Sequence, residues 1–127
     1  MRLGKLLLDT HVFLWWQAND DRLSEPVRSA VAEADVVFVS AASAWEIAIK
    51  VALGRLRIPG SVAEGVAESG FERLPVGFAH AELAGALPAH HRDPFDRMLV
   101  AQAVVEDLVL VSADDRIAAY DVKLLRV

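Results

Sequence analysis

Short apolar runs recur along the chain, each separated from the next by a longer segment of mixed polarity. Four of these runs predict strands, and the first three are continuous enough to be buried on both faces of a sheet. The four runs span residues 6–8, 36–39, 108–111 and 122–125. The segment 71–76 is a weaker candidate because Pro75 cannot donate a backbone hydrogen bond. We place it at an edge of the sheet or in an extended connection.

Sequence patterns typical of helices occupy the segments between these runs. Ser, Asp or Pro stands at several helix starts, and Ser43 with Glu46 has the spacing of a capping box. The predicted helices span residues 10–17, 24–34, 43–54, 61–70, 80–87 and 93–105, with a short helix after Asp114. Strands that alternate with helices indicate βαβ units. We therefore predict an α/β fold with a mostly parallel central sheet and helices on both faces.

The size and composition of the chain narrow the possibilities further. It has 127 residues, 54% of them hydrophobic, with no repeat, low-complexity tract or linker, so we predict one domain spanning residues 1–127. The absence of cysteine excludes disulfides, thiolate nucleophiles and cysteine-ligated metal sites. The apolar residues near the N-terminus are interrupted at 9–11. This interruption predicts no membrane span or signal peptide and favours a cytoplasmic protein.

Acidic side chains follow several of the predicted strands and helix starts. Asp9 comes directly after the first strand, and Asp114 lies three residues beyond Val111. Glu46 and Asp96 lie in the first turns of two predicted helices. Because the carboxyl ends of parallel strands meet at one edge of a sheet, we expect these four carboxylates to converge. Their mutual repulsion requires a cation, and hard oxygen ligands suit Mg²⁺ or Mn²⁺.

The chain is acidic overall, with 18 Asp and Glu against 13 Lys and Arg and a formal net charge of -5. This balance provides no general positive field of the kind that marks many nucleic-acid-binding proteins. A carboxylate site that binds divalent cations nevertheless lowers the net charge by itself. Such a site implies metal-assisted hydrolysis of phosphodiester bonds, in which the cation activates a bound water.

Each acid also has a structural alternative. Glu46 completes the capping box or pairs with Lys50 four residues later. Asp96 interacts favourably with the N-terminal end of its helix, and Asp114 has the position of an N-cap. Asp9 is harder to explain in this way, because a carboxylate that abuts three leucines needs a partner for its burial.

Histidines and arginines near these acids suggest further contacts. The four histidines lack the spacing of a zinc site, and we expect His90 and His91, in a polar loop, to form loop hydrogen bonds or to contact RNA. Arg92 and Arg97 flank Asp96, where they are candidates for contact with a nucleic-acid backbone. The chain has no glycine-rich phosphate loop or serine-hydrolase elbow, which weakens nucleotide-binding and serine-hydrolase interpretations.

Four segments carry a resemblance to a known family. They read LLDTHVFLWW at 7–16, VSAASAWEIAIKVALGRL at 39–56, HRDPFDRMLVAQA at 91–103 and LVSADDRIAAYDVKLL at 110–125. In this order they resemble PIN-domain ribonucleases, and specifically the VapC-type toxins of bacterial toxin–antitoxin pairs. The resemblance covers nearly the whole chain, and its first and third segments are the most specific.

The resemblance implies a magnesium-dependent endoribonuclease with a three-layer α/β/α fold, in which Mn²⁺ is a possible substitute for Mg²⁺. It places the catalytic and metal-binding roles on four acids: Asp9, Glu46, Asp96 and Asp114. Asp9 would be the central metal ligand, with Glu46 and Asp96 completing the set. Asp114 would bind the metal directly or through water.

The same resemblance distinguishes these acids from their neighbours, because the segments align in favour of them over Asp93 and Asp115. Ser112 stands where the family usually has Thr, and it keeps the hydroxyl group. We count Ser112 together with Arg92 and Arg97 as candidate RNA contacts. The family also implies an RNA substrate, a cognate antitoxin that docks near the site, and self-association into a homodimer.

Three other functions compete with this interpretation. A metal-dependent phosphatase of the haloacid-dehalogenase type would use Asp9 as its nucleophile, but it needs a second Asp where His11 stands. A receiver-like phospho-acceptor domain fits less well, because its acceptor should end a later strand. The other alternative is a catalytically silent PIN-like protein-interaction module, and the presence of all four acids argues against it.

Overall fold

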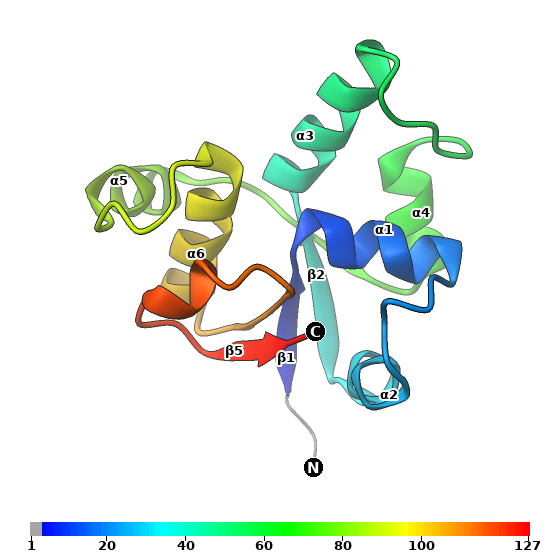
Figure 1. Cartoon of the computed structure of the whole chain (residues 1–127), viewed down its shortest axis with the longest axis horizontal. Helices are drawn as coiled ribbons and strands as arrows, with labels where there is room; N and C mark the ends of the chain where they lie inside the picture. The colour runs from blue at the N-terminus through cyan, green and yellow to red at the C-terminus, as the bar shows by residue number, and fades with distance from the viewer. Residues whose placement is uncertain (1–3) are drawn as a thin grey trace.

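The strands of the chain form one parallel sheet in the order β3-β2-β1-β4-β5 (Figure 1). The structure is a computed structural model that describes residues 4–127. The strands are β1 (Lys5–Leu8), β2 (Val36–Ser40), β3 (Glu72–Leu74), β4 (Val109–Ser112) and β5 (Leu124–Arg126). The predicted parallel α/β sheet is confirmed. The weak segment at 71–76 supplies a short edge strand, as its proline predicts.

Helices connect these strands in the predicted order. Across residues 4–127 they are α1 (Thr10–Ala18), α2 (Glu25–Glu33), α3 (Ala41–Ala52), α4 (Val62–Glu68), α5 (Phe78–Ala86), α6 (Pro94–Glu106) and the 3₁₀ helix η1 (Ile117–Ala119). Ser61 and Asp93, at the starts of two predicted helices, are the N-caps of α4 and α6, and their side chains accept hydrogen bonds from the first turns of these helices. Within this described part of the chain, no helix is both long and apolar enough to cross a membrane.

Helix α3, which carries Glu46, begins earlier than the capping-box pattern predicts. Ser40 is its N-cap, and the Ser40 hydroxyl accepts a hydrogen bond from the backbone N–H of Ala42. Ser43 therefore lies inside the helix and is fully buried, so the predicted Ser43 capping box is wrong. Glu46 is then more than one turn into α3, where its side chain cannot serve as the third residue of a cap.

Alternate residues of β1 point to opposite faces of the sheet, which gives each face its own apolar core. Leu6 and Leu8 pack with residues of α1, α2, α3 and α4. Leu7 packs with Leu99 and Leu110, so the other face is covered by α6, and α5 packs on α6. Figure 1 shows α5 and α6 on one side of β1 and β2, with α1 and α2 on the other. This arrangement confirms the expected three-layer α/β/α fold.

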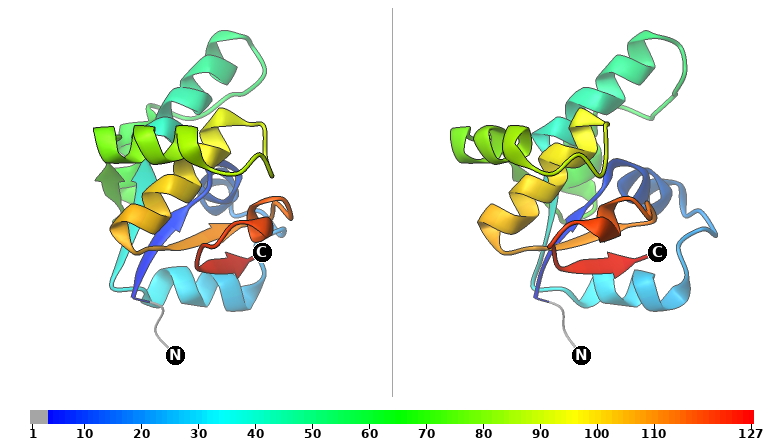
Figure 2. Two further views of the ribbon diagram at one scale, coloured as in Figure 1. Left: turned by 90° about the vertical axis from the view of Figure 1, so that its left-hand side faces the viewer. Right: turned by 60° about the vertical axis from the view of Figure 1, so that its left-hand side comes forward.

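The register of the sheet brings the carboxyl ends of its middle strands to one edge. Leu8 of β1 pairs with Val39 of β2 and with Val111 of β4. Asp9 and Ser112 come next in the chain, so they lie side by side at this edge. Helices α1 and α3 begin there, and α3 extends away from the sheet (Figure 2).

We predict that Leu7→Ala strongly destabilises the fold. Leu7 has no exposed surface and lies in the central strand, so its truncation leaves a cavity under α6. The expected loss in the free energy of unfolding is about 2–5 kcal/mol, measured by urea denaturation. Leu53→Ala is the matched control, because Leu53 is 61% exposed, and it should change the free energy by no more than about 0.5 kcal/mol. Equal effects of the two substitutions would contradict the assigned core.

Candidate metal centre

Asp9 lies at the middle of the carboxyl edge, between β1 and α1. Its Oδ1 accepts a hydrogen bond of 2.9 Å from the backbone N–H of Val12, and its Oδ2 accepts one of 2.5 Å from the Ser112 hydroxyl. Asp9 is only 4% exposed, and this burial raises its pKa despite the two hydrogen bonds, which act in the opposite direction. A buried carboxylate of this kind is stabilised by a proton or a cation, as expected of a metal ligand.

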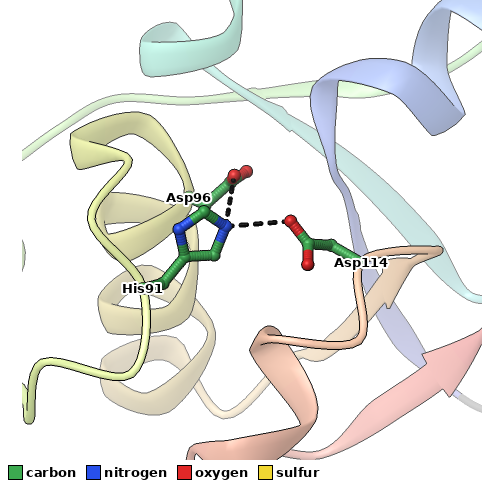
Figure 3. A group of neighbouring side chains, drawn as sticks. All are labelled: His91, Asp96 and Asp114. Atoms are coloured by element: carbon green, nitrogen blue, oxygen red, sulfur yellow. Dashed lines mark hydrogen bonds and ion pairs between the residues drawn. The ribbon is translucent and has the colours of Figure 1, made fainter.

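His91 lies between the carboxylates of Asp96 and Asp114, which come from α6 and from the segment after β4 (Figure 3). Its Nε2 is 3.0 Å from Oδ2 of Asp96 and 2.8 Å from Oδ2 of Asp114. The expected loop hydrogen bond is present, because its Nδ1 accepts a hydrogen bond of 3.1 Å from the backbone N–H of Asp93. The alternative expectation of RNA contact is disfavoured for His91, because this residue is only 3% exposed.

The two carboxylates beside His91 have pKa shifts in opposite directions. Burial and the negative charge of Asp93 raise the pKa of Asp96 to about 7, and the opposing influence of His91 is smaller. Partial burial acts to raise the pKa of Asp114, but hydrogen bonds from Arg116 and His91 outweigh it and lower the pKa to about 2. In the absence of a metal ion, Asp96 is thus partly protonated at neutral pH while Asp114 is ionised.

Glu46 approaches the same edge from α3. Its Oε1 accepts a hydrogen bond of 2.6 Å from the Thr10 hydroxyl, and the hydroxyl oxygens of Thr10 and Ser43 are 2.9 Å apart. The alternative pairing with Lys50 is also present, at 3.3 Å from Nζ to Oε2 of Glu46. The negative charges of Glu46 and Asp9 both raise the pKa of Asp96. Glu46 is therefore near enough to influence Asp96, but its carboxylate contacts Thr10 and Lys50 rather than the other three acids.

The four acids line two hollows that share a wall. The first hollow has a volume of about 460 Å³ and contains three of the acids and two arginines: Asp9, Asp96, Asp114, Arg22 and Arg116. The second has a volume of about 470 Å³ and contains the remaining acid and three basic residues: Glu46, Lys50, Arg55 and Arg92. Asp93 lines both hollows. The acidic centre thus has basic side chains on two sides.

The three predicted RNA contacts have different surroundings. Arg92 is exposed and lines the second hollow, so it remains a candidate. The Arg97 guanidinium donates hydrogen bonds to four backbone carbonyls: those of Ala84, Leu87, Pro88 and His91. Ser112 is only 1% exposed, and its hydroxyl donates to Asp9 and accepts from the backbone N–H of Asp114. The geometry argues against RNA contacts by Arg97 and Ser112, because their polar atoms have partners inside the protein.

Several polar neighbours of the acids are not revealed by the sequence pattern. Thr10 and Arg116 are close in sequence to Asp9 and Asp114, which is a weak signal that they share a site. Tyr120 has no such signal. Its hydroxyl accepts a hydrogen bond of 3.0 Å from the backbone N–H of His91, across 29 residues of sequence. Only the folded chain brings these groups together.

The donor set fits a hard divalent cation. One carboxylate oxygen of Asp96 and one of Asp114 lie within 4.8 Å of each other beside the His91 ring, and Asp9 lines the same hollow. Burial is the main cause of the raised pKa values of Asp9 and Asp96, and the negative charges of neighbouring carboxylates add to it. Carboxylate oxygens in this number suit Mg²⁺ or Mn²⁺ better than a softer metal.

A known protein family matches nearly the whole chain. The family described as "PIN domain" matches residues 6–123. The chain belongs to the PIN-domain family. This assignment confirms the family resemblance of the four sequence segments, and the match includes all four acids.

This PIN domain is 32% identical over 118 residues to Ribonuclease VapC22 of Mycobacterium tuberculosis, covering 91% of each chain. A structure of VapBC2 from Rickettsia felis, bound to a promoter DNA fragment, is similar with a TM-score of 0.70 and 12% identity, covering 97% of this chain and 98% of that one. The VapBC-5 toxin–antitoxin structure from Mycobacterium tuberculosis has a TM-score of 0.64 and 24% identity, with coverage of 98% and 99%. At these identities, the two structures support the fold alone.

We predict that Asp96→Asn becomes increasingly stabilising as the pH rises from about 4 to about 8 in the metal-free PIN domain. The pKa of Asp96 is raised to about 7 in the folded chain by burial and by Asp93, whereas an unfolded Asp has a pKa of about 3.9. The folded state therefore binds this proton more tightly, and the associated stability is complete below pH 4 and lost as the pH rises through 7.

Urea denaturation with EDTA at several pH values measures this effect as the difference in unfolding free energy between Asp96→Asn and the unmodified chain. Asp121→Asn is the control, because Asp121 is an exposed aspartate that lines neither hollow of the centre. Its difference from the unmodified chain should not follow the same pH curve. A pH-independent difference for Asp96→Asn would contradict the raised pKa.

Proposed function

We propose that this PIN domain is a magnesium-dependent endoribonuclease and the toxin of a toxin–antitoxin pair. The observation that carries the proposal is the convergence of Asp9, Asp96 and Asp114 on one hollow at the carboxyl edge of the sheet. The raised pKa values of Asp9 and Asp96 support a site completed by a cation. The ribonuclease name of the relative from Mycobacterium tuberculosis supports RNA as the substrate.

Different residues of the chain would bind the ion and orient its ligands in such a site. Asp9, Asp96 and Asp114 would hold the ion, and Glu46 would complete the acidic set from α3. A bound divalent ion supplies Lewis acidity, which lowers the pKa of a bound water and stabilises charge on a phosphate. Ser112 orients Asp9 through the hydrogen bond to its Oδ2.

Basic residues on both sides of the acids would position the RNA backbone. Arg92 and Arg55 line one hollow, while Arg22 and Arg116 line the other. Arg116 also donates hydrogen bonds to Asp114, so its position is linked to that of the acid. Guanidinium groups here would attract phosphates toward a centre whose carboxylates would otherwise repel them.

The proposal includes protein partners and a location. We propose a cognate antitoxin, self-association into a homodimer, and action in the cytoplasm on RNA. The similar structure from Mycobacterium tuberculosis is described as a member of the VapBC family of toxin–antitoxin systems, which supports the antitoxin. Trp45 and Phe78 are 65% and 88% exposed, and large aromatic side chains in water are typical of surfaces that bind other proteins.

We predict that the purified chain cleaves single-stranded RNA with Mg²⁺ or Mn²⁺. EDTA or Asp9→Asn should each lower the rate by roughly 100-fold or more, because both remove the metal that activates water. Gel analysis of labelled RNA measures the cleavage, and Asp121→Asn should keep full activity, because Asp121 lines neither hollow of the centre. Equal cleavage under all of these conditions would contradict the metal mechanism. Hydrolysis of p-nitrophenyl phosphate without RNA cleavage would instead favour the phosphatase.

We predict that production of the chain without a partner arrests bacterial growth and that Asp96→Ala relieves the arrest. The reason is that Asp96 lines the acidic hollow, so its loss should abolish RNA cleavage without removing the exposed apolar surface. Growth curves after induction measure the effect, with western blots to match protein levels. An arrest that persists in Asp96→Ala would mean that the toxicity comes from binding rather than cleavage.

A further inference from the structure

His91 contacts two of the acids at once. Its Nε2 is within hydrogen-bond distance of Oδ2 of both Asp96 and Asp114, and the residue is only 3% exposed (Figure 3). Its location makes it either a metal ligand or a residue that orients ligands. The hydrogen bonds around the ring distinguish these two roles.

The second ring nitrogen of His91 determines which nitrogen carries the proton. Nδ1 accepts a hydrogen bond of 3.1 Å from the backbone N–H of Asp93, so Nδ1 presents a lone pair. In a neutral imidazole the proton is then on Nε2, which donates a hydrogen bond to Oδ2 of Asp114 and lies 3.0 Å from Oδ2 of Asp96. A metal ligand needs a lone pair at that nitrogen. Ligation through Nε2 would require the proton to leave and the bond from Asp93 to break.

The backbone of His91 is held by Tyr120, which is 29 residues away in sequence, and by the nearer Arg97. The Tyr120 hydroxyl accepts from the backbone N–H of His91 at 3.0 Å and donates to the carbonyl of Pro88 at 2.8 Å. The Arg97 guanidinium donates to the carbonyls of Pro88 and His91 at 3.1 Å and 3.3 Å. Tyr120 is only 7% exposed. These contacts fix the 88–91 segment on two sides and leave the His91 ring little freedom to move.

We propose that His91 is a positioning residue whose Nε2–H holds the Asp96 and Asp114 carboxylates together for a divalent cation, without itself binding the metal. The inference rests on the proposed metal-dependent function. Without a donor between them, two carboxylates repel and separate. Both contacts use Oδ2 atoms, so Oδ1 of Asp96 can approach a cation while Oδ2 remains beside Nε2 of His91. Arg97 and Tyr120 maintain this geometry through the backbone of His91.

Manganese affinity tests the positioning role. Isothermal titration calorimetry with Mn²⁺ should show an affinity roughly 10- to 100-fold weaker for His91→Ala than for the unmodified chain, as is typical when a partner of a metal ligand is lost. His91→Gln should recover most of the affinity, because its amide N–H₂ can replace the Nε2–H donor. His80→Ala is the matched control: His80 is also buried, but it contacts Gly77 and Glu106 outside the centre.

Two spectroscopic measurements on the unmodified chain test the same inference without substitution. ¹⁵N NMR of the metal-free chain should show the proton of His91 on Nε2. Pulsed EPR of the Mn²⁺ complex should show no ¹⁴N coupling from a ligated imidazole. A proton on Nδ1, a ¹⁴N coupling that disappears in His91→Gln, or equal losses of affinity in His91→Gln and His91→Ala would overturn the positioning role.

The outcomes also separate this inference from the proposed function. If the unmodified chain and Asp9→Asn both fail to bind Mn²⁺, the proposed metal-dependent function is wrong, and the inference that depends on it is wrong too. If the unmodified chain binds Mn²⁺ and Asp9→Asn does not, but His91→Ala binds as tightly as the unmodified chain, only the positioning role is overturned. Weaker binding by His91→Ala, with recovery in His91→Gln and no loss in His80→Ala, supports both.

Discussion

The burial of the Asp9 carboxylate at the end of the central strand is the constraint on which the rest of the centre depends. Asp9 is only 4% exposed, and it directly follows three fully buried leucines. Water cannot solvate it well, so its pKa is raised even though Ser112 and Val12 donate hydrogen bonds to it. The surrounding structure can stabilise its charge only by supplying donors or a cation. Ser112 and the backbone of Val12 supply the donors, and the neighbouring carboxylates of Asp96 and Asp114 would hold a cation with Asp9.

The donors come from segments that are distant in sequence. Ser112 reaches Asp9 from the neighbouring strand, and Thr10 reaches Glu46 on α3. His91 joins α6 to the segment after β4 by contacting Asp96 and Asp114. These polar contacts orient carboxylates that would otherwise repel one another. Basic side chains line the same hollows as the four acids, so positive and negative charges lie side by side at this edge of the sheet.

Local sequence signals predict the elements well and the helix caps less well. The run Leu6–Leu8 identifies the central strand because burial on both faces requires continuous apolar residues. The caps at Ser61 and Asp93 follow from local hydrogen bonding and are present. The Ser43 capping box fails because Ser40, at the end of β2, caps α3 first, and Ser43 is instead packed against Thr10. Ser40 and Ser43 are both residues that can cap α3, and tertiary packing determines that Ser40 is the cap.

The sequence by itself determined the parallel α/β fold, the family resemblance and which acids follow the strands, because these depend on local patterns and on the common direction of parallel strands. Only the tertiary structure decided which polar residues surround those acids. It buried His91 between two carboxylates, and it engaged Arg97 and Ser112 inside the protein rather than at the surface. The physical reason is that side-chain direction and burial depend on contacts between residues far apart in sequence. Adjacent residues such as His90 and His91 share a local pattern but have different neighbours in the folded chain.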